Sequence, residues 1–179
     1  FDIKDVPKKG TTALLLLSQS GETKDLHRCI QIARQNNLFL IGVVNVVDSL
    51  IAREVDCGVY LNAGREVGVA STKSFTSQVI ILSLMAIWFA QKRNVNANKR
   101  RQYIRDLRNL HVNIERILQE NYQKMEKYIH FFSDFSNCFL LGKGRAHAIA
   151  LEAALKIKEI AYIHAEGYSA SSLKHGPLA

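Results

Sequence analysis

Short apolar runs alternate with helix-like segments along the first third of the chain. Such runs occupy Ala13–Leu17, Phe39–Asn45 and Gly58–Leu61, and the first two contain little polar alternation. Continuous apolar runs are typical of parallel strands that are buried on both faces. Segments with helical periodicity, Lys24–Asn36 and Ser49–Glu54, lie between these runs. Strands that alternate with helices predict a layered α/β domain with a parallel sheet.

A loop and a long helical region follow the third predicted strand. The loop, Asn62–Lys73, carries two glycines and opens an apolar helix that runs from about Ser74 to Gln91. After a polar break at Asn94–Asn98 comes an amphipathic helix, which we interpret as a structural connector. Its apolar positions, close to helical spacing, are Ile104, Leu107, Leu110, Ile114, Ile117, Leu118, Met125 and Ile129.

The pattern of strand, turn and helix begins again near the end of the chain. Cys138–Leu141 predicts a strand, Gly142-Lys143-Gly144 a turn, and the segment from about Arg145 to Ile163 a helix. We therefore predict a first α/β unit at residues 1–91, a helical connector at 92–136 and the start of a second unit at 137–179. The second unit is expected to be truncated, because the chain stops before a sheet could be completed.

The first predicted strand ends in three hydroxyl-bearing residues and a glycine. The segment Ser18-Gln19-Ser20-Gly21-Glu22-Thr23 lies between that strand and the start of the first helix. Free N–H groups and the helix dipole attract anions at such a place, and hydroxyls can donate hydrogen bonds to a phosphate. Serine and threonine also serve as plain helix caps, so this segment alone leaves both interpretations open. Ligands of parallel sheets bind at the carboxyl ends of the strands, which is where this segment lies.

A second group of polar residues stands on the otherwise apolar last helix. Glu152, Lys156 and Glu159 are spaced i, i+4 and i+7, so they share one helix face. Charges on such a helix indicate either a solvent-facing stripe of ion pairs or a functional site. Downstream, the turn at Gly176-Pro177 is suited to hold His175 beside a ligand.

Composition narrows the classes of function. The 179-residue chain has a net charge of +8, which suits an anionic ligand and would suit nucleic acid equally well. Much of that charge lies between Lys92 and Arg108, where Tyr103 is the single aromatic residue and no nucleic-acid motif is present. We interpret this stretch as a solvated helix face and expect no nucleic-acid partner. Three widely spaced cysteines indicate neither a zinc site nor a disulfide framework.

Targeting signals are not recognisable in the sequence. The longest apolar stretch, Val79–Ala90, is interrupted by Ser83 and is shorter than a bilayer requires. No signal peptide is evident. We therefore expect a cytoplasmic protein without a membrane partner.

Two sets of motifs, in a consistent order, resemble a known family. Ser18-Gln19-Ser20-Gly21-Glu22-Thr23, followed by Ala63-Gly64 and Gly68-Val69-Ala70-Ser71-Thr72-Lys73, is similar to the sugar isomerase (SIS) domain. Segments near the end of the chain resemble a second SIS unit. They are Ala154-Leu155-Lys156-Ile157-Lys158-Glu159-Ile160, Tyr162, His164 and Lys174-His175-Gly176-Pro177-Leu178-Ala179. Together they resemble the isomerase half of the glutamine–fructose-6-phosphate aminotransferase family.

This resemblance implies a fold and a substrate. The fold would consist of three-layer α/β/α SIS units with parallel sheets, joined by a helical connector. The reaction would convert fructose 6-phosphate, with ammonia from glutamine, to glucosamine 6-phosphate, and it would need no cofactor or metal. By position, the residues that bind the sugar phosphate would be Ser18, Gln19, Ser20, Thr23, Val69 and Ser71.

The resemblance also implies catalytic roles. Glu159 would be the base that moves a proton between C1 and C2, and Lys156 would assist near the sugar oxygens. His175 would promote ring opening from a neighbouring subunit, which implies a homodimer. These roles fit the chemistry, because aldose–ketose isomerisation needs a carboxylate beside the reacting carbons and a cation or donor for the enediol-like intermediate.

The chain departs from the family in several places. Ser171-Ser172 stands where Gly-Glu is usual before the Leu-Lys-His-Gly-Pro turn, and Arg65 stands where a small residue is common. The first strand of the first SIS unit and the carboxyl-terminal tail are not recognised, so both units are expected to be incomplete. No cysteine precedes Cys29, so the family's glutaminase domain is expected outside this sequence.

A second function remains open at this stage. A non-catalytic SIS protein that binds phosphosugars, such as a regulator, would use the same phosphate-binding segment. Such a protein would not need Glu159, Lys156 and His175 in this arrangement, so their presence favours the enzyme.

Overall fold

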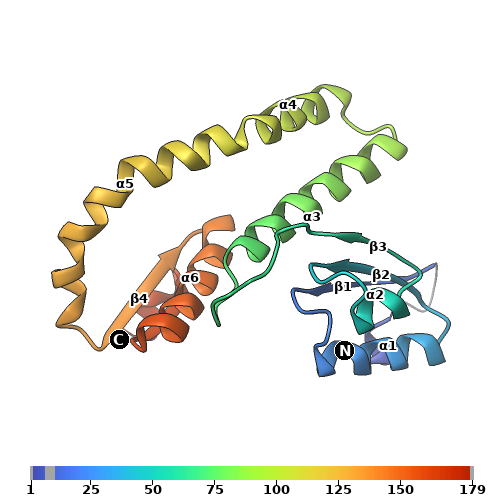
Figure 1. Cartoon of the computed structure of the whole chain (residues 1–179), viewed down its shortest axis with the longest axis horizontal. Coiled ribbons are helices and arrows are strands. Elements are labelled where there is room, and N and C mark those ends of the chain that lie inside the picture. The colour runs from blue at the N-terminus through green and yellow to red at the C-terminus, as the bar shows by residue number, and fades with distance from the viewer. Residues whose placement is uncertain (1, 7–10, 178–179) are drawn as a thin grey trace. The chain divides into compact units, whose positions relative to one another are not determined.

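The computed structural model describes residues 2–6 and 11–177, and these form two compact units. The first unit ends at Tyr103 and the second begins at Ile104, so the division falls inside helix α4 (Ala97–Arg108). The predicted connector, residues 92–136, comprises α4 and α5 (Leu110–Ser133) in the structure (Figure 1). Each unit contains its own parallel sheet.

The first unit is built on a three-stranded sheet in the order β1-β2-β3. The strands are β1 (Ala13–Ser18), β2 (Phe39–Val44) and β3 (Cys57–Tyr60). The helices are η1 (Ile3–Asp5), α1 (Lys24–Gln35), α2 (Leu50–Glu54) and α3 (Lys73–Lys92). Parallel neighbours need a crossover, and α1 and α2 supply one each. Every strand boundary lies within one residue of the predicted run, and the predicted α/β fold class is confirmed.

One face of this sheet is covered by α1 and α2 and forms the core of the unit. Leu16, Leu40 and Val44 point to this face and are at most 2% exposed. Ile30 on α1 and Ile51 on α2 pack against them and are buried equally well. Burial of each such side chain stabilises the fold by about 1.5–3 kcal/mol. The apolar stripe of α1 therefore fixes that helix to the sheet.

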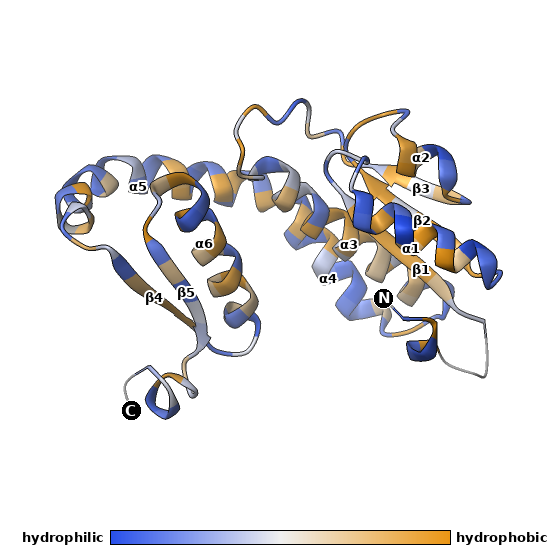
Figure 2. Cartoon of the chain, turned by 90° about the horizontal axis from the view of Figure 1, so that it is seen from below, coloured by the Kyte–Doolittle hydropathy of each residue, from blue (hydrophilic) through white to orange (hydrophobic). Residues whose placement is uncertain are grey.

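The opposite face of the sheet is partly covered within the described part of the chain. Val43 on β2 is fully buried, but Leu15 and Leu17 on β1 are 41% and 38% exposed. α3 lies along this face (Figure 2), and an apolar cavity of about 540 Å³ separates part of it from β2 and β3. The prediction that β1 is buried on both faces is therefore wrong, because an apolar run does not specify what covers it.

α3 has the length and composition of a helix that could cross a membrane, and it is the one such helix among the described residues. The helix has 20 residues, so the prediction from the apolar stretch Val79–Ala90 underestimated its length. Between Lys73 and the apolar stretch, the helix is lengthened without a further charge by uncharged polar residues, which are Ser74, Thr76, Ser77 and Gln78. Although 6% of its most apolar window is buried, the helix turns Ile81, Leu84 and Trp88 toward the sheet across the cavity. That is the arrangement of a helix that covers a sheet face.

Asp56, directly before β3, joins three elements at the amino edge of the sheet. Its carboxylate accepts a hydrogen bond from the Leu40 N–H at 2.7 Å and another from the Arg34 guanidinium at 2.7 Å. The Leu40 hydrogen bond, followed by the Arg34 hydrogen bond, lowers the pKa of Asp56 below its usual 3.8. The ionised carboxylate thus holds the end of α1 against the starts of β2 and β3.

The second unit contains β4 (Asn137–Gly142), α6 (Arg145–Ala161) and β5 (His164–Ser169), followed by the short helix η2 (Leu173–His175). β4 and β5 pair in parallel, and α6 is the crossover between them. The sequence predicted β4 and α6 but not β5. That strand is polar, and it has a regular structure because β4 supplies partners for its backbone.

Two glycines let α6 approach the strands of this sheet closely. A Cβ on Gly142 of β4 would lie 2.1 Å from the Ala146 carbonyl oxygen, and one on Gly167 of β5 would lie 2.7 Å from Leu151 Cα. Both obstacles are backbone atoms, which cannot turn aside as a side chain can. Alanines 150 and 154 are the buried residues of α6, so small side chains on the helix meet glycine on the strand.

Glu66 fixes the loop that joins β3 to α3. Its carboxylate accepts hydrogen bonds from the Thr72 N–H at 3.3 Å, the Thr72 hydroxyl at 3.1 Å and the Ser74 N–H at 3.1 Å, and also from the Ser74 hydroxyl. The Ser74 hydroxyl is the largest cause that lowers the pKa of Glu66 to about 2. An acidic group at the amino end of a helix also interacts favourably with the helix dipole. The half-buried Glu66 therefore caps α3 and closes the loop on itself.

Replacement of Gly167 by alanine should destabilise the second unit. Because the new methyl group meets backbone atoms of α6, we expect the free energy of unfolding to fall by about 1–3 kcal/mol, the usual cost of overpacking. Gly176→Ala is the matched control, since nothing closer than 4.0 Å would meet its Cβ. Urea unfolding of the whole chain measures the stability of both variants. Equal midpoints would show that the close approach of α6 to Gly167 does not contribute to stability.

Glu66→Gln should lower stability in a pH-dependent way. The folded-state pKa of about 2 lies below the ordinary value of 4.5, so the carboxylate stabilises the fold above pH 4.5. That contribution is lost as the pH falls from 4.5 toward 2, and the gap between the two proteins should narrow over this range. Urea midpoints at pH 7, 5, 4 and 3 test this. Glu120→Gln on α5 controls for the loss of one exposed charge, and a gap that is independent of pH would contradict the assignment.

Candidate functional site

The carboxyl ends of β1, β2 and β3 meet at one edge of the first sheet. Ser18 pairs with Val44, and Val44 pairs with Tyr60, so the strands end side by side. The ladder continues past the strands, because the Asn45 N–H donates to the Ser18 carbonyl at 3.3 Å and the Leu61 N–H donates to the Val44 carbonyl at 3.0 Å. The segments 18–23 and 61–72 therefore leave the sheet at the same edge, where parallel sheets bind ligands.

The segment Ser18–Thr23 forms a compact turn at the start of α1. Gly21 has a φ of +70°, and a Cβ there would lie 1.9 Å from Ser49 Oγ, so only glycine fits. The Ser18 hydroxyl accepts the Gly21 N–H at 2.9 Å and lies 3.1 Å from Thr23 Oγ1. Thr23 occupies the cap position of α1 but makes no side-chain cap hydrogen bond. The plain capping interpretation is therefore not realised.

The hydroxyls of this turn differ in their exposure. Ser18 is 4% exposed and its hydroxyl is bonded inside the turn, whereas Thr23 is exposed and Ser20 is half-buried. Ser20 Oγ accepts the Glu22 N–H at 3.2 Å, which leaves its own proton free to donate. Gln19 is half-buried, and its backbone carbonyl accepts the Val46 N–H at 3.3 Å. The turn thus presents Ser20 and Thr23 beside the uncapped start of α1.

The start of α2 is hydrogen-bonded to the turn. The Leu50 N–H donates to Glu22 Oε1 at 2.9 Å, and the Ile51 N–H donates to the Gly21 carbonyl at 3.0 Å. Ser49, 4% exposed, places its hydroxyl where a side chain at position 21 would be, and that hydroxyl has no hydrogen-bond partner in the described part of the chain. Sequence reasoning did not single out Glu22 as a support, because its partner lies 28 residues away.

The predicted loop Asn62–Lys73 ends at residue 72 in the structure, because α3 begins at Lys73, and it is anchored at both ends. Asn45 is 8% exposed; its side-chain amide donates to the Gly64 carbonyl at 2.7 Å, and its carbonyl oxygen accepts the Ala63 N–H at 3.0 Å. Glu66 holds the other end. Between these anchors Val69 is 94% exposed and Ser71 is half-buried. Sequence reasoning missed Asn45 and Glu66, and the available signal for Asn45 was a polar residue directly after a buried strand.

In the second unit, Lys156 lies between two carboxylates on α6. Its ammonium is 2.7 Å from Glu159 Oε2 and 3.4 Å from Glu152 Oε1. These three side chains are 21–30% exposed, so the predicted common face exists and is partly shielded from solvent. The hydrogen bond to Glu159 is the largest cause that raises the pKa of Lys156, and the charge of Glu152 adds to it. Lys156 therefore carries a full positive charge at neutral pH.

His175 lies in the short helix η2 and not on α6. It ends η2, and its N–H donates to the Ser172 carbonyl at 3.0 Å, while the Ser169 and Ser171 hydroxyls lie 3.0 Å apart. The side chain is exposed, and no hydrogen bond or ion pair between described residues joins it to Lys156 or Glu159. The last two residues of the recognised motif, Leu178 and Ala179, lie outside the described residues.

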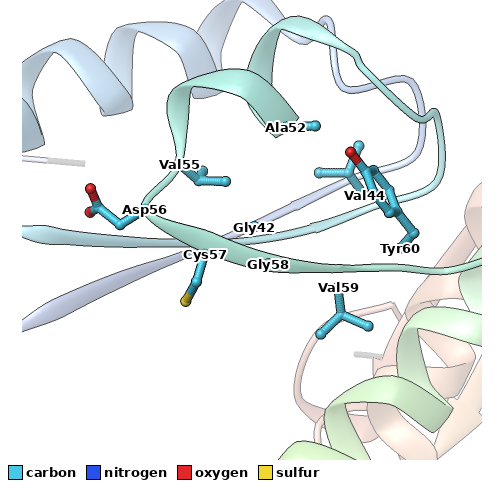
Figure 3. A pocket seen from close by; sticks show the side chains of 9 residues that line it. All are labelled: Gly42, Val44, Ala52, Val55, Asp56, Cys57, Gly58, Val59 and Tyr60. Atoms are coloured by element: carbon cyan, nitrogen blue, oxygen red, sulfur yellow. The ribbon is translucent and has the colours of Figure 1, made fainter.

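A pocket of about 210 Å³ runs along β3 beneath α2 (Figure 3). Figure 3 shows the side chains of Cys57 and Val59 pointing away from Ala52 and Val55 on the α2 side. Its charged lining residue, Asp56, is already bonded to β2 and α1. The predicted site residues do not line this pocket, so we place the candidate site at the strand ends. Over residues 2–6 and 11–177, no group of His, Cys, Asp and Glu is arranged to hold a metal ion.

Comparison with known proteins identifies the family of the chain. The SIS domain family matches residues 9–88 and 131–179. A relative from Acanthamoeba polyphaga mimivirus, named as a probable glutamine–fructose-6-phosphate aminotransferase (isomerizing), is 48% identical over the whole chain. Relatives of the same enzyme name from Tropheryma whipplei and Homo sapiens are 43% and 42% identical over 100% and 91% of the chain. The chain spans 29%, 29% and 24% of the length of these relatives.

Solved structures agree with the fold. The C-terminal domain of glucosamine–fructose-6-phosphate aminotransferase from Francisella tularensis has a TM-score of 0.87 and is 34% identical, covering 96% of this chain and 50% of that chain. Glucosamine-6-phosphate deaminase from Thermotoga maritima has a TM-score of 0.75 over 97% of this chain and 51% of that chain, and its identity of 21% supports the fold alone. The resemblance inferred from the two motif sets is thereby confirmed, and the chain belongs to the SIS domain family.

Proposed function

We propose that the chain is the isomerase part of a glutamine–fructose-6-phosphate aminotransferase and that its substrate class is the hexose 6-phosphates. The observation that carries this proposal is the hydroxyl-lined turn at the uncapped start of α1. The names of the curated relatives support the specific reaction, which converts fructose 6-phosphate with ammonia from glutamine to glucosamine 6-phosphate. The glutaminase that supplies the ammonia would lie outside this sequence.

The phosphate of the substrate would bind at the Ser18–Thr23 turn. The first N–H groups of α1 and the positive end of its dipole attract the phosphate, and the Ser20 and Thr23 hydroxyls donate to its oxygens. Ser18 would keep the turn in shape, because its buried hydroxyl is already engaged by Gly21 and Thr23. Gln19 would be the fourth residue of this turn that contributes to the phosphate site. Binding energy at this non-reacting end of the sugar can position the reacting carbons.

Proton transfer would be carried by the ion pair on α6. Glu159, as a carboxylate, would take a proton from one carbon and return it to its neighbour, and the Lys156 ammonium would stabilise the negative oxygen that forms between these steps. The raised pKa of Lys156 suits this role, because the residue stays cationic at neutral pH. A phosphosugar-binding regulator would need the turn at α1 but not this pair, so the pair favours the enzyme.

Three further assignments complete the proposal. His175 would promote ring opening of the sugar from a second copy of the chain, as the family resemblance implies, so we propose a homodimer. Val69 and Ser71 would contact the sugar from the 62–72 loop. We also propose a cytoplasmic location, without a membrane or nucleic-acid partner.

Ser20→Ala should weaken binding of glucosamine 6-phosphate and of inorganic phosphate alike. The variant loses a hydrogen bond to a charged oxygen, so we expect both dissociation constants to rise about tenfold. Ser83→Ala is the matched control, because that hydroxyl bonds to the Val79 carbonyl within α3. Isothermal titration of the 179-residue chain measures all of these values. If neither ligand binds to the unaltered chain, the proposed phosphate site is wrong.

Glu159→Gln should abolish isomerisation while sparing affinity. The amide keeps the shape of the side chain but cannot accept the carbon-bound proton, so the rate should fall at least about 100-fold. Isomerisation of fructose 6-phosphate followed by proton NMR, with titration of glucosamine 6-phosphate in parallel, separates the two effects. Glu126→Gln, an exposed change on α5, is the control. Normal turnover by Glu159→Gln would refute its role as the base, and binding without turnover by the unaltered chain would favour the regulator.

A further inference from the structure

Asn45 is the residue that connects the two loops of the candidate site. Its backbone N–H donates to the Ser18 carbonyl at the foot of the phosphate turn. Its side chain bonds to the other loop twice, with the amide on the Gly64 carbonyl at 2.7 Å and the oxygen on the Ala63 N–H at 3.0 Å. The residue is 8% exposed, so water does not readily replace these bonds. Neither the reaction nor the recognised motifs assign a role to it.

The loop that Asn45 holds has few other constraints near its start. Asn62 and Gly64 have positive φ values of 52° and 71°, so the chain turns sharply directly after β3. Val67 and Val69 are 90% and 94% exposed and gain little from packing. Glu66 fixes the end of the loop on α3 but makes no bond to β1 or β2. The side chain of Asn45 is therefore the direct polar link from the strand ends to this loop among the described residues.

We propose that Asn45 is a positioning residue that sets the 62–72 loop relative to the phosphate turn, so that the loop receives the sugar of a ligand whose phosphate is held at Ser18–Thr23. This inference rests on the proposed function. It predicts a selective effect: a hexose phosphate uses both loops, whereas inorganic phosphate uses the turn alone. Loss of the Asn45 side-chain bonds should thus weaken the hexose phosphate and leave inorganic phosphate unaffected.

Two substitutions at this position test the proposal in different ways. Asn45→Asp keeps the shape but places a carboxylate oxygen against the Gly64 carbonyl, where the native amide donates. Asn45→Ala removes both side-chain bonds and leaves the backbone bond to Ser18 in place. Asn36→Asp and Asn36→Ala are the matched controls, because the Asn36 amide donates to the Ile32 carbonyl at 2.8 Å at the other end of α1.

Isothermal titration of the 179-residue chain with glucosamine 6-phosphate and with inorganic phosphate separates the possible outcomes. We expect Asn45→Ala to lose about tenfold in affinity for glucosamine 6-phosphate, which corresponds to about 1.4 kcal/mol, and to bind inorganic phosphate within about twofold of the unaltered chain. Asn45→Asp adds a negative charge beside the turn, so it should weaken both ligands, and glucosamine 6-phosphate more than inorganic phosphate. Equal losses for both ligands, or no loss for the hexose phosphate, would overturn the role of Asn45 alone. If the unaltered chain binds neither ligand, the proposed function fails, and the role of Asn45 fails with it.

A measurement on the unaltered chain keeps the proposal testable if both variants fail to fold. Hydrogen exchange at the Ala63 amide reports the bond to Asn45 directly. Glucosamine 6-phosphate should slow this exchange at least about tenfold, because a sugar held between the loops opposes their separation, while inorganic phosphate should leave it unchanged. The same exchange rate with either ligand would overturn the proposal.

Discussion

The in-register parallel pairing of β1, β2 and β3 determines where the candidate site can form. Leu16 and Leu40 must both face α1 and α2 to be buried, and a shift of the register by one residue would turn one set of side chains to the opposite face. The core therefore specifies the register, and the register brings the residues after Ser18, Val44 and Tyr60 to one edge. Hydrophobic burial on one face of the sheet thus places polar loops at its end.

The sequence predicts those features that depend on near neighbours. The boundaries of β1 and β2 follow from their apolar runs. The contacts of Lys156 with Glu152 and Glu159 follow from helical spacing, because each partner lies about one turn from Lys156. The bonds within the Ser18–Thr23 turn are likewise local.

Features that depend on distant partners could not be read in this way. The bond from Asn45 to Gly64 exists only after β2 and β3 have paired, so no short pattern could indicate it. β5 is polar and becomes a strand because β4 pairs with it and because Gly167 lets α6 approach. The exposure of Leu15 is also a tertiary property, since its apolar character is the same whether or not another element covers β1.

Two long helices of the first unit begin after strands of the same sheet, and they differ in whether a side chain caps their first N–H groups. The start of α3 is occupied by the carboxylate of Glu66, whose low pKa keeps it ionised and whose oxygens already accept both nearby N–H groups. The start of α1 has no side-chain cap: of its nearby carboxylates, Glu22 accepts the Leu50 N–H of α2, and Asp25 is exposed in the first turn. Both helix dipoles attract anions, but at α3 the Glu66 carboxylate already accepts the N–H groups that a phosphate would need. In the proposed function the phosphate therefore binds beside Ser20 and Thr23 at α1, where no side chain caps the helix, and not at α3, whose first N–H groups are already bonded.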